Sequence, residues 1–432
     1  MQLPKQWIKQ IQRGAYDNQW QWLYGGTTDR QAARHIEALG AFEENYGADT
    51  PACLVSAPGR TELCGNHTDH QRGHVLAAAV TMDMLAVTAP RRDGRIILES
   101  RGYGRTQINL DELAPEKAEE GTTAALLRGM AARLHALNHA IGGFEAYVCS
   151  DVPAGGGLSS SAAMEVLIGS IFNFLYNDGA LTPVCIAQAG QYAENRYFGK
   201  PCGLMDQLAS AVGGAAAMDF DDAASPRVAR ITCDFDAMGH ALYVVNAGGS
   251  HAGLTGEYAA IPAEMGAVAA AFEKDVLRQV DKAAFYARLG SLRGVVSDRA
   301  ILRAMHYFGE DERAVALGRA VEAADAEACK AIMLASGASS MNRLQNIYPA
   351  LQSGERSVAL ALALSEELLA GRGAWRIQGG GFAGTIQALV PHALCAAYEE
   401  RMRAAFGAGC CSRLHIRPMG GYLLKEEEVY GE

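Results

Sequence analysis

The feature that most constrains the fold is a glycine-rich loop between an apolar strand and a long apolar helix. Residues 144–152, FEAYVCSDV, are predicted to form the strand, and the loop PAGGGLSSS follows at residues 153–161. Glycines there let backbone N–H groups approach a ligand, and the helix N-terminus favours negative charge. The loop is therefore either a phosphate cradle or a flexible connection capped by serines. The pattern GxxxxGK[ST] is absent, which excludes a P-loop NTPase.

The chain length favours two domains, because 432 residues exceed what one hydrophobic core usually organises. We place the boundary near residues 215–220 and divide the chain into residues 1–217 and 218–432. CLVSAPGR is predicted to be a strand that ends at its Pro-Gly turn, and residues 75–100 a β-meander. The second half mixes a few strands with helices, as in an α+β domain, and the helices are expected at 259–272, 297–308, 310–336 and 357–369.

Charge and composition exclude several classes of protein. Lys and Arg total 38 against 48 Asp and Glu, a net charge of −10, and no basic cluster exceeds Arg91-Arg92, so we expect no nucleic-acid partner. The first residues lack a signal-peptide core, and the apolar segment 162–176 is too short to span a bilayer, so we expect a cytoplasmic protein without a membrane partner. The 10 cysteines include no CxxC pair, which disfavours structural zinc and disulfides.

A polar turn follows the first predicted strand and predicts a polar ligand site. It gathers six polar side chains within residues 60–70, namely Arg60, Glu62, Asn66, His67, Asp69 and His70. A zinc site is the alternative interpretation, with ligands from His67, Asp69, His70 and His74.

Two carboxylates and a second glycine cluster lie elsewhere in the chain. Asp206 and Glu194 stand in apolar or small-residue surroundings, where an ionised group needs a metal or another cation, although either could be a helix cap or a solvated residue. The cluster GGGFAG at residues 379–384 could cover a ligand or form a tight turn. A dinucleotide site is disfavoured there, because the next segment, TIQALV, reads as a strand.

Together these segments resemble the galactokinase branch of the GHMP kinases. SAPGRTELCGNHTDH (residues 56–70) is similar to the signature around PGRVNLIGEHTDY, and VPAGGGLSSSAAMEV (152–166) is similar to the ATP loop of the family. GKPCGLMDQLASAVGG (199–214) resembles the segment with the catalytic aspartate, and RIQGGGFAGTIQALV (376–390) the late glycine-rich motif. In a fainter match, Tyr258 of GLTGEYAA stands where galactokinases place a sugar-contacting tyrosine. The similarity spans roughly residues 50–425.

The resemblance implies an α+β, two-domain GHMP kinase fold. Its N-terminal domain would be like ribosomal protein S5 domain 2, its C-terminal domain would be ferredoxin-like, and the active site would lie between them. The implied activity is that of an ATP-dependent sugar-1-kinase with ATP and Mg²⁺, galactose being the expected substrate. A kinase of another monosaccharide and a catalytically silent sugar sensor are the alternatives. We expect a monomer, with a homodimer as the alternative.

The resemblance also implies roles for individual residues. Asp206 would accept or orient the proton of the sugar hydroxyl, and Arg60 would stabilise the transferring phosphoryl group. Ser161 and Glu194 would hold Mg²⁺. The ATP phosphates would lie against Gly155, Gly156, Gly157, Leu158, Ser159, Ser160 and Ser161. The sugar would contact Asn66, His67, Thr68, Asp69 and Tyr258.

Three residues of the sugar-binding turn depart from the family pattern. Asn66 replaces the usual Glu, Glu62 replaces the usual Asn, and His70 replaces the usual Tyr. An amide donates as well as accepts hydrogen bonds, whereas a carboxylate only accepts. The substitutions therefore predict altered sugar specificity, while the residues with implied catalytic roles are all retained.

Overall fold

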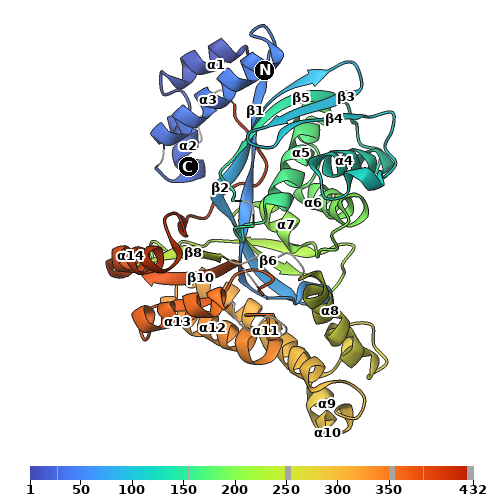
Figure 1. Ribbon diagram of the computed structural model, residues 1–432, viewed down its shortest axis with the longest axis vertical. Helices are drawn as coiled ribbons and strands as arrows, with labels where there is room; N and C mark the ends of the chain where they lie inside the picture. Colours follow the sequence, from blue (N-terminus) through green and yellow to red (C-terminus); the bar gives the residue numbers. More distant parts are fainter. Residues whose placement is uncertain (27, 154, 249–253, 350–355, 383, 426–432) are drawn as a thin grey trace.

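Two β-sheets with helices packed around them make up the computed structural model, which describes residues 1–26, 28–153, 155–248, 254–349, 356–382 and 384–425 (Figure 1). In the eight-stranded first sheet, β1 (Cys53–Cys64) and β2 (His74–Arg91) run antiparallel to each other. One half of β2 pairs with β5 (Gly143–Ser150) and the other half with β6 (Ala215–Asp219). The sheet is completed by β3 (Arg95–Ser100), β4 (Gly104–Asn109), β7 (Arg227–Ile231) and β12 (Tyr422–Leu423).

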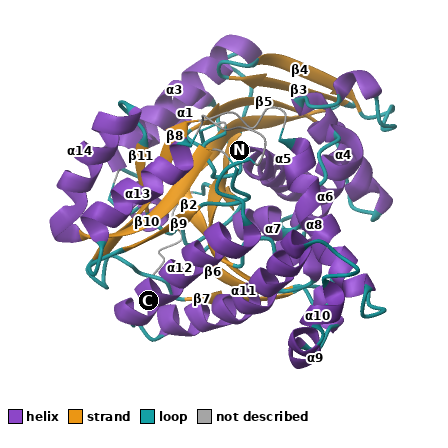
Figure 2. Cartoon of the chain, turned by 60° about the horizontal axis from the view of Figure 1, so that its bottom comes forward, coloured by secondary structure: helices purple, strands orange, loops and turns teal. Residues whose placement is uncertain are grey.

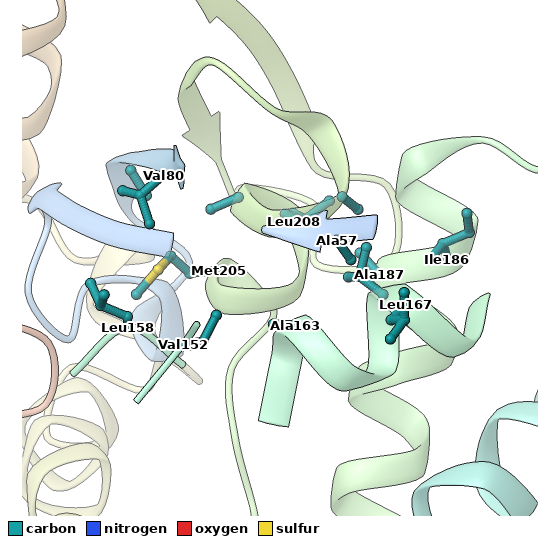
Figure 3. Packing of buried hydrophobic residues seen from close by; sticks show 14 of the residues in the cluster. Ala57, Val80, Val152, Leu158, Ala163, Leu167, Ile186, Ala187, Met205 and Leu208 are labelled. Atoms are coloured by element: carbon teal, nitrogen blue, oxygen red, sulfur yellow. The ribbon is translucent and has the colours of Figure 1, made fainter. Parts of the chain in front are cut away.

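Helices cover both faces of this sheet, which explains why its central strands are apolar almost throughout. Leu54 and Val87 pack against one helical layer, and their neighbours Val55 and Ala86 belong to the core on the other face, as the alternation of a strand requires. The first layer comprises α1 (Pro4–Ile11), α2 (Asp17–Tyr24) and α3 (Thr28–Tyr46). The second comprises α4 (Thr123–Ala136), α5 (Ser160–Tyr176), α6 (Pro183–Ala193) and α7 (Met205–Val212). Figure 3 shows how side chains from this second layer meet the strands.

The second sheet confirms the expected ferredoxin-like topology. Its four antiparallel strands lie in the order β11-β8-β10-β9, which in chain order is fourth, first, third, second. They are β8 (His240–Gly248), β9 (Ala374–Ile377), β10 (Gly384–Pro391) and β11 (Cys411–Leu414). The helices α13 (Ser357–Leu369) and α14 (Cys395–Phe406) pack on one face of this sheet (Figure 2).

The remaining helices lie between β8 and β9 in the sequence. The helix expected to break at Gly309 is continuous, because Gly309 lies in the interior of α11 (Asp298–Glu322). The break comes at Ala324, which adopts a positive φ of 52° and precedes α12 (Ala326–Ser339). The expected helices at 297–308 and 310–336 are therefore corrected to α11 and α12. The group consists of α8 (Thr255–Ala270), α9 (Lys282–Ala287), α10 (Leu289–Leu292), α11 (Asp298–Glu322) and α12 (Ala326–Ser339).

Two further expectations about the strands need correction. β1 does not end at the Pro58-Gly59 turn but continues through it with a shift of register, a β-bulge, where the missing N–H of proline is tolerated. The meander expected over residues 75–100 is wrong, because the successive strands β2 and β3 do not pair with each other; β5 lies between them and pairs with both.

The domain division expected between residues 217 and 218 falls inside β6. Sheet pairing continues into β7, and the chain returns at its end to pair β12 with β1. The first sheet therefore holds strands from both halves of the sequence. We propose a boundary after Ile231, with the segment from about residue 417 returning to the first unit.

A buried cluster around Asp83 ties the N-terminal helices and the C-terminal segment to β2. Asp83 accepts hydrogen bonds from Tyr24 (2.6 Å) and Arg34 (2.5 Å), and also pairs with Arg417. Burial alone would raise the pKa of Asp83, but the two guanidinium groups outweigh it and lower the pKa to about 2. In the described part of the chain, no helix combines the length and the apolar character needed to cross a membrane.

Candidate active site

Arg60 and Asp206 form a two-pronged ion pair where β1 meets the start of α7. Arg60 Nε donates to Asp206 Oδ1 at 2.7 Å, and Arg60 Nη2 donates to Oδ2 at 2.6 Å. The bulge at Gly59 precedes Arg60, whose backbone N–H donates to Leu158 O at 3.0 Å. Asp206 lies in the first turn of α7, where the helix dipole favours a carboxylate. Residues 146 positions apart in the sequence are thus joined in one charged pair.

The environment keeps Asp206 ionised. Burial raises the pKa of this carboxyl group, but Arg60 and the Ser159 hydroxyl, which donates to Oδ2 at 2.7 Å, outweigh that effect and hold the pKa below its usual range. The side chain remains 29% exposed, so it can be approached from one side. A carboxylate in this state can orient a hydroxyl group and receive its proton late in a reaction.

The glycine-rich loop lies against this pair. Arg60 Nη1 donates to Gly157 O at 2.8 Å, and Gly157 has a φ of 73°. A Cβ atom on Gly157 would lie 2.1 Å from Thr385 Oγ1, so only glycine fits. Ala154 lies outside the described residues, and Gly155 is exposed with a φ of 68°. Because α5 begins at Ser160, the loop leads directly into a helix N-terminus, as the cradle interpretation requires.

Two residues of the loop have structural duties that the sequence did not predict. The side chain of Leu158 is buried in the hydrophobic core next to Val152 (Figure 3). The hydroxyl of Ser159 donates to Asp206. Contact of Leu158 and Ser159 with ATP stays a prediction.

The two predicted metal ligands are in contact. Ser161 Oγ donates to Glu194 Oε1 at 2.9 Å, and Lys200 Nζ lies 3.0 Å from the same oxygen. Gln207 Nε2 donates to Glu194 Oε2 at 2.9 Å. Glu194 opens a π-helical turn, Glu194–Phe198, a feature often found at functional sites.

A zinc site at the polar turn is not supported. Within the described residues, no group of three or more His, Cys, Asp or Glu side chains is arranged to hold a metal ion. His74, one of the four expected ligands, instead pairs with Asp311 at 3.0 Å and with Asp219 at 3.4 Å.

Side chains of α11 hold the polar turn in place through hydrogen bonds to its backbone. Glu310 Oε1 accepts the backbone N–H groups of Gly65 (3.1 Å) and Asn66 (3.4 Å), and His306 Nε2 lies 2.9 Å from Asn66 O. Burial raises the pKa of Glu310, but His306, Arg313 and Arg376 outweigh it, so the pKa is lowered and the carboxylate stays ionised. Thr68 is fully buried, and its hydroxyl lies within hydrogen-bond distance of Gly65 O and His74 O. These contacts of Thr68 stabilise the turn, and its contact with a sugar stays a prediction.

Asn66 is enclosed by protein groups. Its amide nitrogen donates to Gly379 O and lies 3.3 Å from both carboxylate oxygens of Glu62, while its oxygen accepts from Asn346 Nδ2 at 2.8 Å. Glu62 in turn pairs with Arg376 at 2.8 Å. A sugar hydroxyl could therefore reach Asn66 only by replacing one of these partners.

The late glycine cluster lies across the expected sugar site. Three successive carbonyl groups, those of Gly379, Gly380 and Gly381, face Asn66, His67 and Tyr258 respectively, with distances of 3.0 Å from Gly380 O to His67 Nε2 and 2.8 Å from Gly381 O to the Tyr258 hydroxyl. Because a carbonyl only accepts, His67 donates through Nε2. Burial is the main cause that lowers the pKa of His67 to about 4, and the nearby charge of His70 lowers it further. The ring is therefore neutral near pH 7.

The sugar side and the nucleotide side of the site are joined through this cluster. Gln378 Nε2 donates to Gly157 O at 3.1 Å, and Gln378 is followed directly by the three glycines.

The two remaining residues predicted to bind the sugar are Asp69 and Tyr258. The Asp69 carboxylate lies against Gly203, where an added Cβ would come within 1.8 Å of Asp69 Oδ2. Burial raises the pKa of Tyr258 to about 12, and the charge of Lys200 opposes that rise. The predicted residues thus come from five separate segments but form one site.

Several residues of the site were missed by the sequence analysis. They are Lys200, His306, Glu310, Asn346 and Gln378. Lys200 and Gln378 lie inside recognised motifs and could have been noticed there. His306 and Glu310 lie in the interior of a long helix, where no local pattern distinguishes them from core or surface residues.

Comparison with known proteins decides the family. Residues 40–90 match the family model "Galactokinase galactose-binding signature", and residues 125–214 match "GHMP kinases N terminal domain". Over 369 residues the chain is 33% identical to the galactokinase of Streptomyces coelicolor, covering 85% of this chain and 92% of that protein. The chain belongs to the galactokinase family of GHMP kinases. Membership makes it an ATP-dependent phosphotransferase that acts on a sugar hydroxyl.

Solved structures confirm the expected GHMP kinase fold. Lactococcus lactis galactokinase complexed with galactose matches with a TM-score of 0.76 and 23% identity, covering 89% of this chain and 98% of that one. Methanococcus jannaschii mevalonate kinase matches with a TM-score of 0.58 and 15% identity, covering 85% and 99% of the two chains. The mixed α/β, two-domain architecture is therefore that of the GHMP kinases, including members that are not galactokinases.

Proposed function

We propose that this galactokinase-family protein transfers the γ-phosphoryl group of ATP to the anomeric hydroxyl of galactose. The observation that carries the proposal is the Arg60–Asp206 pair, with contacts of 2.6 and 2.7 Å, lying against the glycine-rich loop. In this proposal Asp206 is the proton acceptor, Arg60 is the cation, and the glycine-rich loop is the phosphate cradle. The name of the Streptomyces relative, a galactokinase, supports galactose as the acceptor.

In the proposed reaction, Asp206 orients the attacking hydroxyl and receives its proton. Its lowered pKa means that the carboxylate is ready ionised at neutral pH and that proton transfer comes late. Arg60 holds Asp206 through two nitrogens and also contacts the loop, so its charge lies where phosphate oxygens gain negative charge in the transition state. Phosphoryl transfer is mainly positioning and charge neutralisation, which this pair supplies.

Magnesium belongs to the proposal because the residues present fit it. Ser161 and Glu194 bring a hydroxyl and a carboxylate oxygen within 2.9 Å of each other beside the loop. Mg²⁺ is commonly held by one or two protein oxygens, with phosphate oxygens and water completing the shell. When bound, the ion would neutralise phosphate charge; Ser161 and Glu194 would hold it. Glu194→Ala should therefore raise the Mg²⁺ concentration needed for half-maximal activity.

The sugar would bind among His67, Asp69 and Tyr258. Because the Gly379–Gly381 carbonyls face His67 and Tyr258, sugar hydroxyls must replace or share those hydrogen bonds. Relative to the family pattern, Glu and Asn are exchanged between positions 62 and 66, so the carboxylate is absent from position 66, where the family places a sugar-facing Glu. This exchange favours a second candidate function, a kinase of a related monosaccharide.

The test is an ADP-release assay with Mg²⁺ and a panel of free monosaccharides, run on the wild type and on Arg60→Ala. The proposal expects galactose to give the highest kcat/KM and Arg60→Ala to lose kcat with little change in ATP binding. If another sugar gives the highest kcat/KM, the second candidate, a kinase of a related monosaccharide, is the correct one. If no sugar causes ADP release, both candidate functions are wrong.

We also propose that the protein is a cytoplasmic monomer. Size-exclusion chromatography with light scattering would test the oligomeric state.

A further inference from the structure

The ammonium group of Lys200 lies where the proposed metal would bind. Lys200 Nζ is 3.0 Å from Glu194 Oε1, and Ser161 Oγ donates to that same oxygen at 2.9 Å. The Glu194 side chain is 3% exposed, whereas the Lys200 side chain is 63% exposed. The ammonium group of an exposed lysine thus pairs with an almost fully buried carboxylate, on the oxygen that also accepts from Ser161.

The Lys200 ammonium and a Mg²⁺ ion would compete for the Oε1 atom of Glu194. Glu194 Oε2 accepts from Gln207 Nε2 at 2.9 Å, whereas Oε1 lies beside the Ser161 hydroxyl, so a metal held by both Ser161 and Glu194 would use Oε1. A divalent ion on Oε1 would repel the ammonium from the position it holds. The Lys200 backbone N–H donates to Glu194 O at 3.1 Å, so the residue stays beside the site even when its side chain moves.

We propose that Lys200 exchanges partners during nucleotide binding: it neutralises Glu194 in the metal-free protein and binds an ATP phosphate oxygen in the Mg²⁺–ATP complex. The inference rests on the proposed function, because it requires Mg²⁺–ATP at the glycine-rich loop. The released ammonium would find phosphate negative charge within the same site, and lysine is a common phosphate-binding cation. Lys200 is thus a nucleotide-binding residue beyond the predicted set.

The partner exchange predicts two opposite changes in Lys200→Met. Mg²⁺–ATP should bind about 10-fold more weakly, because a charge-assisted hydrogen bond to phosphate is lost. Mg²⁺ alone should bind more tightly, because its competitor for Glu194 has been removed. A residue that served only as a surface ion pair would produce neither change.

The experiment is isothermal titration calorimetry of the full chain with Mg²⁺–ATP, and separately with Mg²⁺ alone. The variants are Lys200→Met and Lys200→Arg, which keeps the charge and should stay within about 3-fold of wild type for Mg²⁺–ATP. The matched control is Lys282→Met, because Lys282 also pairs with a glutamate, Glu312, at 2.6 Å, but lies on the exposed surface outside the site. The control should bind both ligands like wild type.

The outcomes separate this inference from the proposed function. If wild type binds Mg²⁺–ATP and Lys200→Met binds it within about 2-fold, partner exchange is wrong and the kinase proposal stands. Weaker Mg²⁺–ATP binding without tighter Mg²⁺ binding would also overturn the exchange. If wild type itself fails to bind Mg²⁺–ATP, the proposed function fails and the exchange fails with it. Should Lys200→Met be unstable by thermal melting, Lys200→Gln provides the same comparison.

Discussion

Asp206 is the residue whose chemistry can be isolated most cleanly. Asp206→Asn keeps the shape but removes the negative charge and the proton acceptor, so we predict a kcat loss of at least about 10²-fold with ATP binding retained. Steady-state kinetics and nucleotide titration measure both. Asp93→Asn is the matched control, because Asp93 also accepts two hydrogen bonds from one arginine, Arg91, on the surface. Near-normal turnover in Asp206→Asn would remove Asp206 from the proposed mechanism.

The Glu62 carboxylate and the Asn66 amide are in contact, so a substitution at either position should affect the other. In Asn66→Glu, a second carboxylate would stand beside buried Glu62 and the Gly379 carbonyl; in Glu62→Asn, Arg376 would lose its carboxylate partner. We predict that each single variant loses stability and activity, and that the double exchange loses less than the sum. The coupling should be on the order of 1–3 kcal/mol in a double-mutant cycle of urea unfolding. Strict additivity would show that the two positions are independent.

The sequence identified the residues with proposed roles in the reaction more readily than the residues that hold them in place. Arg60, Asp206, Ser161 and Glu194 were found because short motifs carry them, and the structure brings them together in two pairs. The partners of Asn66 could not be found in this way. Glu62 is local, but Asn346 is 280 residues away and reaches the turn from the segment that follows the π-helical turn Ser340–Leu344, which packs on α11.

Among the elements, the late glycine cluster has the most direct functional consequence. A Cβ atom on Gly380 would lie 2.9 Å from Tyr258 Cε1, so Gly380→Ala should displace Tyr258 or the loop. We predict a rise of about 10-fold in KM for the sugar with ATP affinity unchanged, since the three atoms nearest to the added Cβ belong to Tyr258 and His67, on the sugar side of the site. Gly266→Ala in α8 is the control, because nothing lies within 4 Å of its added Cβ. Unchanged sugar kinetics in Gly380→Ala would separate the cluster from sugar binding.

Element boundaries show where local patterns mislead. Pro58-Gly59 reads as the end of a strand, but pairing with β2 on one side and contact with Leu158 on the other carry β1 through a bulge. Gly309 reads as a helix break, yet it costs only about 1 kcal/mol in a helix interior, which the packing of α11 readily outweighs. In both cases tertiary contacts override the intrinsic preference.

The whole molecule depends on the buried cluster around Asp83, which joins α2, α3, β2 and the returning C-terminal segment. Asp83→Asn would leave Arg34 and Arg417 without their shared carboxylate, and we predict a loss of about 3–5 kcal/mol in unfolding free energy. The pKa of Asp83 is lowered to about 2 in the folded protein, against about 3.9 in an unfolded chain. Its contribution is therefore present above about pH 4 and is lost as the pH falls towards 2.

Urea unfolding of wild type and Asp83→Asn at pH 7, 4 and 3 tests this assignment. The difference between the two proteins should be largest at pH 7 and should shrink as the pH falls. Asp93→Asn, in an exposed pair, should unfold much like wild type at pH 7. A difference independent of pH would mean that the Asp83 charge is not what stabilises the cluster.

The global architecture was largely predictable, except for the path of the chain between its units. The order of the four motifs implied two domains with a site between them, and the second sheet has the expected strand order. The division at residue 217 stays a prediction; it falls inside β6, because β6 and β12 are short strands that pair with the distant strands β2 and β1, while β7 extends the sheet by pairing with β6. Such long-range pairing leaves no signature in local composition.

NMR of the product shows whether this site phosphorylates the anomeric oxygen of galactose, as we propose. Wild type would be incubated with ATP, Mg²⁺ and galactose, and the phosphorylated carbon assigned from phosphorus–proton and phosphorus–carbon couplings. We predict a single sugar phosphate, with the phosphorus coupled to C1 and its proton, that is absent with Asp206→Asn over the same time. Phosphate on any other carbon, or ADP formed without a sugar phosphate, would contradict the claim.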